Sequence, residues 1–183
     1  MKKFIISVDA GTTSNRSILF DLKGKPIFSS QKEFTQYFPK SGWVEHNPDE
    51  IWKTTTKTLK DVIQKARSLR GKILSIGITN QRETTVLWDK KTGKPVYKAI
   101  VWQDRRTEEF CKKLRKQNKD TMVFNKTGLL IDSYFSGTKI KWILDNVPKA
   151  RQLMSKKQLL FGTIDSFLIW RLTKGKVHAT DAT

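Results

Sequence analysis

The sequence predicts an α/β fold with a mixed sheet, because a β-meander comes first, an amphipathic helix and a buried strand follow, and helices dominate the last third. The meander consists of apolar runs at residues 4–8, 17–20 and 27–34, separated by turn residues. A chain of 183 residues can form one globular domain with a sizeable core. No proline- or serine-rich linker and no repeat divides it, so we expect one continuous domain with a helical elaboration.

The segment after Asn47 carries the clearest helix signal. Asn47 can cap a helix, Pro48 suits the first helical position, and Glu50 stands where a capping box places a carboxylate. Mostly apolar residues then recur every three or four positions and form one stripe: Ile51, Trp52, Thr55, Leu59, Val62, Ile63 and Ala66. We therefore expect a helix to about Ser68 that packs on the sheet, followed by a buried strand at residues 73–79.

The rest of the chain predicts one more hairpin and then helices. Residues 84–88 and 96–97 flank a turn rich in glycine, proline and lysine, which predicts a second β-hairpin. A short strand is expected at 99–102 and a charged helix at about 105–117. The remaining expected elements are helices at 138–145, 148–155 and 164–172 and a brief apolar run at 159–161.

The net charge of +19 and a pI near 10.1 raise nucleic acid or an anionic membrane as partners. Most of the basic residues are lysines, however, and they are scattered along the chain. Recognition of phosphates and bases favours clustered arginines. We expect a solvated basic surface and no specific nucleic-acid partner. A non-catalytic domain that binds nucleic acid or proteins through this surface is the alternative of a different class.

Cysteine and histidine usage indicates neither a disulfide nor a metal site. Cys111 is the only cysteine, and the two histidines stand far apart. The apolar run at 4–8 is too short for a signal peptide and is interrupted by Asp9. No segment reaches the roughly 20 apolar residues of a membrane span. We therefore expect a cytoplasmic protein without membrane insertion.

The turn between the first two predicted strands contains residue types that bind phosphate. Gly11 allows close approach of the backbone to a ligand, and the carboxylate of Asp9 can hold Mg²⁺. Hydroxyl groups and a cation follow, at Thr12, Thr13, Ser14 and Arg16. A simple glycine turn is the alternative. The sequence contains no Walker P-loop, no G-x-G-x-x-G and no G-x-S-x-G motif, so phosphate handling falls on this turn.

Two further segments suit a small polyol. Arg82 and Glu83 follow the buried strand, and a hydroxyl group needs both the donor and the acceptor that this pair supplies. An exposed ion pair is the alternative. Trp102 and Tyr134 stand among polar residues, where an aromatic wall could cover the carbon atoms of a polyol. Ordinary core packing is the alternative for both aromatic residues.

Five segments resemble the glycerol kinases of the FGGY carbohydrate kinase family, in the same order and at matching spacing. They are residues 9–16 (DAGTTSNR), 42–46 (GWVEH), 77–85 (GITNQRETT), 102–107 (WQDRRT) and 134–139 (YFSGTK). The NQRETT segment is the most diagnostic, because other FGGY sugar kinases share the turn but differ there. The resemblance implies an actin-like, ribonuclease H-like domain with a β-meander and flanking helices. An FGGY kinase for a pentulose or another polyol is the alternative within the family.

The resemblance also implies roles for particular residues. It assigns the ATP phosphates to Thr12, Thr13, Ser14 and Arg16, Mg²⁺ to Asp9, and glycerol to Arg82, Glu83, Trp102 and Tyr134. The implied reaction converts ATP and glycerol to ADP and sn-glycerol 3-phosphate, in an enzyme that is a homo-oligomer when full length. The general base and the adenine-binding domain are expected beyond Thr183. Residues 1–183 are therefore expected to form an N-terminal domain without a catalytic base and with little activity alone.

Overall fold

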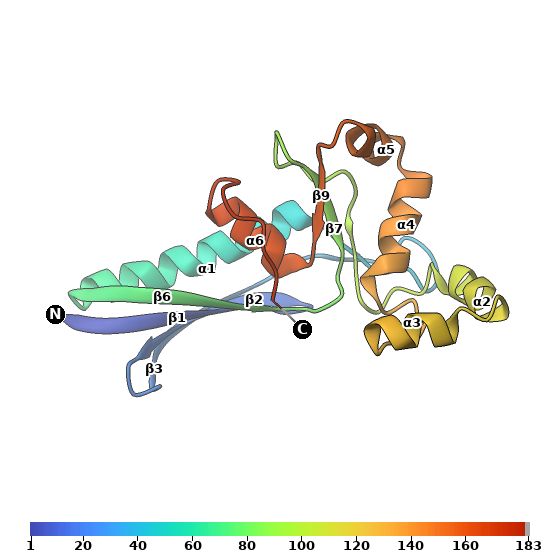
Figure 1. The fold of residues 1–183 in the computed structure, drawn as a ribbon. Coiled ribbons are helices and arrows are strands. Elements are labelled where there is room, and N and C mark those ends of the chain that lie inside the picture. Colours follow the sequence, from blue (N-terminus) through green and yellow to red (C-terminus); the bar gives the residue numbers. More distant parts are fainter. Residues whose placement is uncertain (182–183) are drawn as a thin grey trace.

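A four-stranded mixed sheet forms one end of the computed structural model, which describes residues 1–181 (Figure 1). Strands β1 (Lys2–Ala10), β2 (Ser14–Asp21) and β3 (Pro26–Glu33) form the predicted antiparallel meander. Strand β6 (Gly71–Asn80) pairs in parallel with β1, which gives the order β3-β2-β1-β6. The α/β fold class and the mixed sheet predicted from the sequence are thus confirmed.

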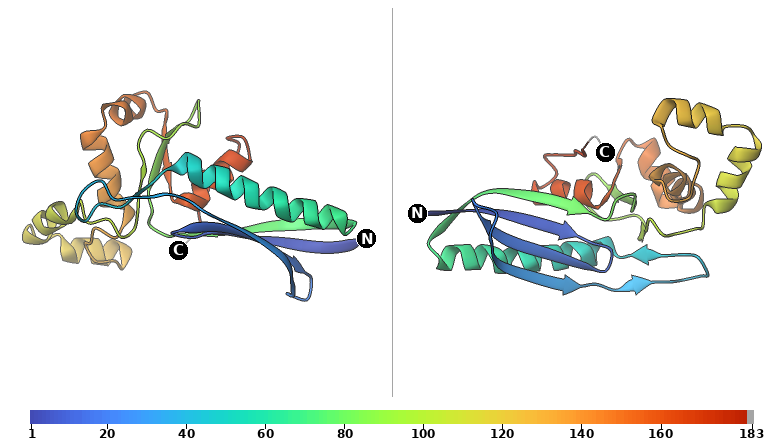
Figure 2. Two further views of the ribbon diagram at one scale, coloured as in Figure 1. Left: turned by 180° about the vertical axis from the view of Figure 1, so that it is seen from behind. Right: turned by 90° about the horizontal axis from the view of Figure 1, so that it is seen from below.

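Helix α1 (Pro48–Ser68) covers one face of this sheet. The Asn47 side chain accepts a hydrogen bond from the Asp49 backbone N–H at 3.0 Å and caps the helix as predicted. Most of the predicted stripe is buried, and it packs on apolar side chains of β1 and β2: Phe4, Ile6, Val8 and Leu19. Among residues 1–181, no helix covers the opposite face of β1, β2 and β3 (Figure 2, right). Alternation along β1 places Asp9 on that open face.

Two small sheets join the main sheet to the helices. Strands β4 (Gln36–Tyr37), β5 (Glu45–His46) and β8 (Ala99–Ile100) form one of them. In the other, β7 (Val86–Asp89) pairs with β9 (Leu159–Gly162).

The predicted second hairpin is therefore only partly right. The chain does turn back, because Trp88 and Pro95 form an isolated bridge and the Val96 backbone N–H donates to the Leu87 carbonyl at 2.9 Å. The Asp89 backbone N–H also donates to the Lys94 carbonyl at 3.0 Å, so Pro95 occupies a non-hydrogen-bonded position where its missing N–H removes no bond. Strand β7 pairs in addition with β9, far along the chain.

Helices form the other end of the molecule (Figure 1). They are α2 (Glu108–Lys116), α3 (Asp120–Thr127), α4 (Ser136–Asn146) and α5 (Pro148–Ser155). Helix α6 (Ile164–Leu172) lies apart from them, between α1 and β9 (Figure 1). Helix α3 was not predicted; none of its residues is buried, so it has no apolar stripe to reveal it. Helix α6 packs with Trp88 and Phe34 in a second core cluster. None of the helices within residues 1–181 is long and apolar enough to cross a membrane.

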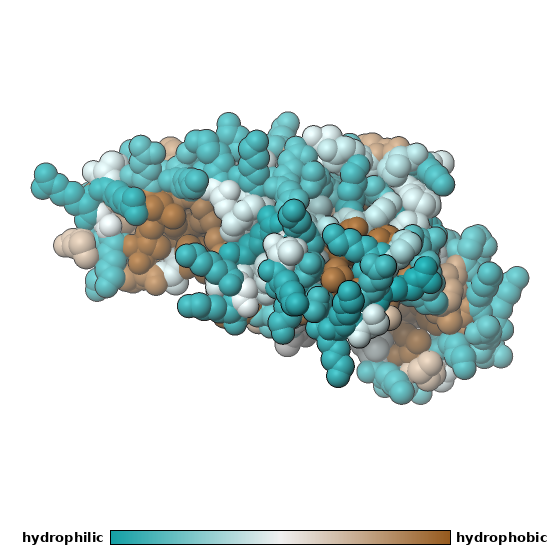
Figure 3. Space-filling model, turned by 90° about the horizontal axis from the view of Figure 1, so that it is seen from above, coloured by the Kyte–Doolittle hydropathy of each residue, from teal (hydrophilic) through white to brown (hydrophobic). Residues whose placement is uncertain are grey.

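Hydrophobic side chains also lie on the surface at both ends of the molecule (Figure 3). Strand β6 is an edge of the main sheet, and its Leu74 and Ile76 side chains are 48% and 42% exposed. At the helical end, Phe124 and Leu130 are exposed.

Neighbouring isoleucines on β1 test which face of the sheet carries the core. Ile6 is fully buried under α1, whereas Ile5 points to the open face and is 37% exposed. We expect Ile6→Ala to lower the free energy of unfolding by about 2 to 5 kcal/mol, because it leaves a cavity in the core. Ile5→Ala is the control and should cost less than half as much. Urea denaturation measures both, and equal losses would contradict this assignment of the faces.

Candidate functional site

The parallel pairing of β1 and β6 brings two predicted site segments to the same edge of the sheet. Ala10 at the end of β1 is in register with Asn80 at the end of β6. The Gln81 backbone N–H then donates to the Ala10 carbonyl at 2.9 Å. The turn that begins at Gly11 therefore lies beside the polar segment at residues 81–85.

A pocket of about 350 Å³ opens at this edge, lined by Thr12, Asn80, Gln81, Arg82, Trp102 and Tyr134. The Trp102 indole Nε1–H donates to Thr12 Oγ1 at 3.1 Å, and its ring meets Tyr134 edge-to-face with the centroids 6.0 Å apart. The Asn80 Oδ1 atom is buried and has no hydrogen-bond partner within residues 1–181. Most buried polar atoms of folded proteins have such a partner, so this oxygen is an exception at the wall of the pocket.

Glu83 lies beside this pocket, and Ser136 holds its carboxylate. Its Oε2 atom accepts hydrogen bonds from Ser136 N–H at 2.9 Å and Ser136 Oγ at 2.8 Å, at the first residue of α4. Its φ of +62° is left-handed, which costs a residue with a side chain roughly 1 to 2 kcal/mol. Its carbonyl accepts from Lys139 Nζ at 3.0 Å, Thr85 Oγ1 at 3.2 Å and Ser136 Oγ at 3.3 Å. These donors hold the strained turn in place.

The remaining predicted phosphate and metal residues lie next to the pocket but do not line it. Asp9 and Arg16 are cross-strand neighbours, and both are exposed. Arg16 Nε donates to Gln31 Oε1 at 3.0 Å, while Ser14 Oγ accepts from Gln31 Nε2 at 2.8 Å. The Thr13 side chain is exposed. Of the predicted phosphate and metal residues, only Thr12 therefore lines the pocket together with the polyol residues. The others, Asp9, Thr13, Ser14 and Arg16, lie beside it.

No group of three or more potential metal ligands (His, Cys, Asp or Glu) occurs within the described part of the chain. Mg²⁺ does not require one, because it is commonly held by one or two carboxylates, substrate phosphates and water. Asp9 is a single exposed carboxylate near the turn and fits that mode of binding. Gly11 keeps the turn tight, since a Cβ atom there would lie 3.2 Å from the Ser14 carbonyl oxygen.

A fully buried histidine connects the turn to the substrate segment. His46 Nε2 lies 2.6 Å from Gln36 Oε1, and Gln36 Nε2 donates to the Thr12 carbonyl at 3.1 Å. On the other side of the ring, Gln81 Nε2 lies 3.2 Å from His46 Nδ1 and donates to the Gly11 carbonyl at 3.1 Å. This arrangement requires a proton on Nε2 and a lone pair on Nδ1.

The environment keeps this imidazole neutral. Burial lowers the pKa of His46 to about 4, and the opposing attraction of the Glu50 charge is smaller. The hydrogen bonds continue through Thr84, whose Oγ1 donates to Gln81 Oε1 at 3.0 Å and accepts from the Trp102 N–H at 3.3 Å. Sequence reasoning assigned no site role to Gln36, Gln81 or Thr84.

A buried arginine anchors the segment that carries Trp102. The Arg106 guanidinium bonds Asp104 at 2.8 Å and Glu45 at 2.9 Å, and all three side chains are almost fully buried. Its Cζ atom lies 3.9 Å from the ring centroid of Trp43 and 4.6 Å from that of Trp142. The ion pair between Arg106 and Glu45 therefore connects the chain after β8 to β5, which also contains His46.

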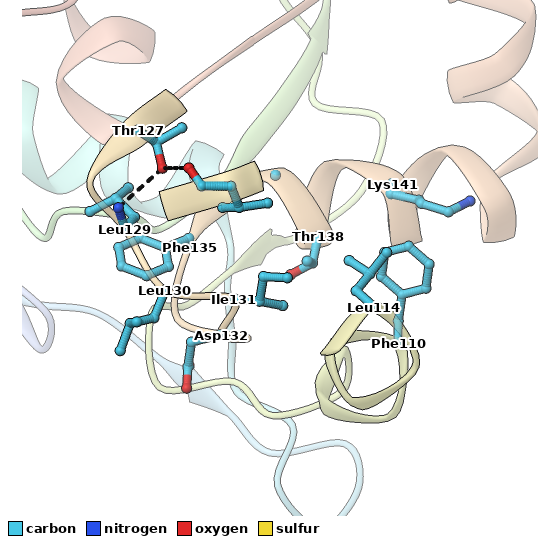
Figure 4. A pocket seen from close by; sticks show the side chains of 12 residues that line it. Phe110, Leu114, Thr127, Leu129, Leu130, Ile131, Asp132, Phe135, Thr138 and Lys141 are labelled. Atoms are coloured by element: carbon cyan, nitrogen blue, oxygen red, sulfur yellow. Dashed lines mark hydrogen bonds between the residues drawn. The ribbon is translucent and has the colours of Figure 1, made fainter. Parts of the chain in front are cut away.

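The second notable cavity lies among the helices and has a different character. It measures about 330 Å³, and mainly apolar side chains from α2, α3, α4 and the α3–α4 connection line it, including Phe110, Leu114, Ile131 and Phe135 (Figure 4). The polar groups at its wall do not converge on one point, so it lacks the donor and acceptor pattern that orients a polyol.

Comparisons with known proteins find relatives over the whole chain. Residues 4–183 match the FGGY family of carbohydrate kinases, N-terminal domain. A glycerol kinase of Malacoplasma penetrans is 60% identical over 182 residues, which make up 100% of this chain and 36% of that protein. The chain thus spans little more than a third of the length of this relative.

Solved structures share the fold. The Plasmodium falciparum glycerol kinase with ADP superposes with a TM-score of 0.90 at 34% identity, over 95% of this chain and 35% of that one. A Lactobacillus acidophilus gluconate kinase superposes with a TM-score of 0.79 at 23% identity, over 93% and 33% respectively, which shows the fold alone. The predicted actin-like, ribonuclease H-like fold class is confirmed.

The neutral state of His46 predicts acid sensitivity. Between pH 6.5 and about 4, the unfolded chain binds a proton at this residue that the folded chain does not bind. The free energy of unfolding should therefore fall as the pH falls through this window, by at most about 3 kcal/mol from this residue.

Urea denaturation at a series of pH values measures this effect. We expect His46→Gln to remove that part of the pH dependence, even if the variant is less stable throughout. His178→Gln is the matched control, because His178 is exposed. An unchanged slope in His46→Gln would rule out the neutral, buried imidazole.

Proposed function

Because the chain belongs to the FGGY family of carbohydrate kinases, we propose that it carries the polyol-binding part of an ATP-dependent kinase that phosphorylates glycerol. The observation that carries this proposal is the pocket of about 350 Å³, in which Arg82, Trp102 and Tyr134 meet Thr12 of the phosphate-type turn. Ligand pockets commonly measure about 300 to 1,000 Å³, so this volume suits a small ligand. The glycerol kinases among its relatives support glycerol as that ligand.

The proposed contacts follow from the chemistry of the lining. The Arg82 guanidinium donates to one hydroxyl group of glycerol, and the Glu83 carboxylate accepts from another. The Trp102 and Tyr134 rings, which stand edge-to-face, cover the carbon atoms.

The phosphates of ATP are proposed to bind at the turn beside this pocket. Backbone amides and hydroxyl groups from Thr12 to Ser14 would face the phosphates, and Arg16 would add positive charge. Asp9 would hold Mg²⁺, which neutralises developing charge when bound. Direct in-line transfer requires the accepting hydroxyl group to lie close to the γ-phosphate, and the bond between Trp102 and Thr12 supports such proximity.

A general base for the accepting hydroxyl group is proposed to come from outside residues 1–181. Glu83 is engaged by Ser136, and Asp9 lies on the open face of the sheet. We therefore propose that this chain binds glycerol without appreciable turnover. For the complete protein we propose a cytoplasmic homo-oligomer that uses ATP and Mg²⁺.

Arg82→Ala tests the proposed site. Arg82 is exposed, and within the described chain it makes no hydrogen bond or ion pair, so its removal should leave stability nearly unchanged. Loss of a charged donor should weaken glycerol binding about tenfold or more. Calorimetric titration of this chain measures the dissociation constant. Arg151→Ala, which removes an exposed arginine of α5, is the control and should bind like wild type.

A second prediction compares the binding of glycerol with that of xylulose. We expect glycerol to bind this chain about tenfold more tightly than xylulose, because the curated relatives of highest identity reported above are glycerol kinases. A parallel assay should detect no glycerol-dependent release of ADP from ATP. Tighter binding of xylulose would assign a different substrate to the site, and measurable turnover would require a base within the chain.

A further inference from the structure

Lys139 is a lysine in an unusual position. It lies in the first turns of α4, its side chain is fully buried, and lysine is almost never buried without a partner. Its hydrogen-bond acceptors are two backbone carbonyl oxygens, those of Glu83 and Tyr134, rather than carboxylates. A buried cation that is committed to two backbone groups fixes the chain at both of them.

The two carbonyl groups belong to separate segments that each carry a proposed glycerol residue. The first segment contains Arg82 and the left-handed turn at Glu83, and the second contains Tyr134. Ser136, two residues after Tyr134, also connects the two segments, because its N–H and its Oγ–H donate to Glu83 Oε2. Lys139 thus hydrogen-bonds to the backbone of both segments with one side chain.

We propose that Lys139 is a positioning residue of the polyol site, which holds the left-handed turn at Glu83 and the backbone of Tyr134 in one fixed arrangement. This inference rests on the proposed function, because it concerns the same pocket. We call this arrangement of Lys139 with the Glu83 and Tyr134 carbonyl groups the clamp. Because Glu83 Oε2 already accepts from Ser136, Oε1 is the oxygen left to accept from a ligand hydroxyl group.

The charge on Lys139 fits this role near neutral pH. Burial lowers its pKa to about 8, and the nearby negative charges of Glu83, Asp104 and Asp132 limit the decrease. The ammonium form, with three N–H donors, therefore predominates at pH 7. Arginine would be a poor substitute, because its planar fork is wider than the compact ammonium group.

Lys139→Met tests the proposal, because it keeps most of the side-chain length and removes every donor. We expect glycerol to bind this variant about tenfold or more weakly at a temperature where circular dichroism shows it to be folded. We also expect Glu83 to leave the left-handed region, as measured by NMR backbone chemical shifts or a crystal structure. Lys141→Met is the matched control: it changes an exposed lysine of the same helix and should change neither result.

A role in stability alone would give a different pattern. Ile6→Ala destabilises the core far from the pocket, so it should leave the glycerol dissociation constant unchanged while folded. If Lys139→Met behaves like Ile6→Ala in this assay, or if Glu83 stays left-handed in it, the proposal is overturned. If Lys139→Met does not fold, Ser136→Ala replaces it. That variant removes the single hydroxyl donor that Glu83 Oε2 and the Glu83 carbonyl share, and it should weaken glycerol binding by a smaller factor.

The torsion at Glu83 separates this inference from the proposed function. If the wild-type chain binds xylulose but not glycerol, the substrate is wrong, and the same variants test the clamp with xylulose. If it binds neither, the proposed function fails, but a left-handed Glu83 that is lost in Lys139→Met and kept in Lys141→Met still supports the clamp. A Glu83 that is unchanged in Lys139→Met refutes it in every case.

Discussion

The hydrogen bonds of a neutral imidazole determine how the two ligand-facing segments lie against each other. His46 offers a donor on one side of a rigid ring and an acceptor on the other, and it uses both. Gln36 and Gln81 extend these bonds to the carbonyl groups of the turn. Protonation would turn the acceptor Nδ1 into a donor that faces the Gln81 amide, so the arrangement depends on burial that keeps the ring uncharged.

The sheet topology gives this interaction its place. Strands β1 and β6 run in parallel, so the segments that leave them emerge at one edge and need only short polar links to become a single site. The segment after β6 also contains a strained residue, because the backbone of Glu83 is left-handed. A residue that violates its own backbone preference next to a pocket is typical of binding sites, where the surrounding structure holds the conformation.

Local patterns in the sequence predicted the parts of the fold that depend on neighbouring residues. The meander, the capped helix after Asn47 and the polar residues at the strand ends all have such signals. The pairing of β7 with β9 and the role of Lys139 do not, because both depend on contacts between distant segments. A lysine near the start of a helix normally indicates a solvent-facing position, and only the tertiary structure shows that it is buried.

Within residues 1–181, one edge of β6 has no neighbouring strand, and the net charge of +19 affects how this edge meets other molecules. An edge strand with partly exposed Leu74 and Ile76 can template pairing with another molecule, and like charge opposes that approach. Dissolved salt weakens this repulsion, since the Debye length falls from about 30 Å at 0.01 M to about 8 Å at 0.15 M ionic strength. The colloidal stability of this chain should therefore decrease as ionic strength rises, which makes dilute buffer the better medium for handling it.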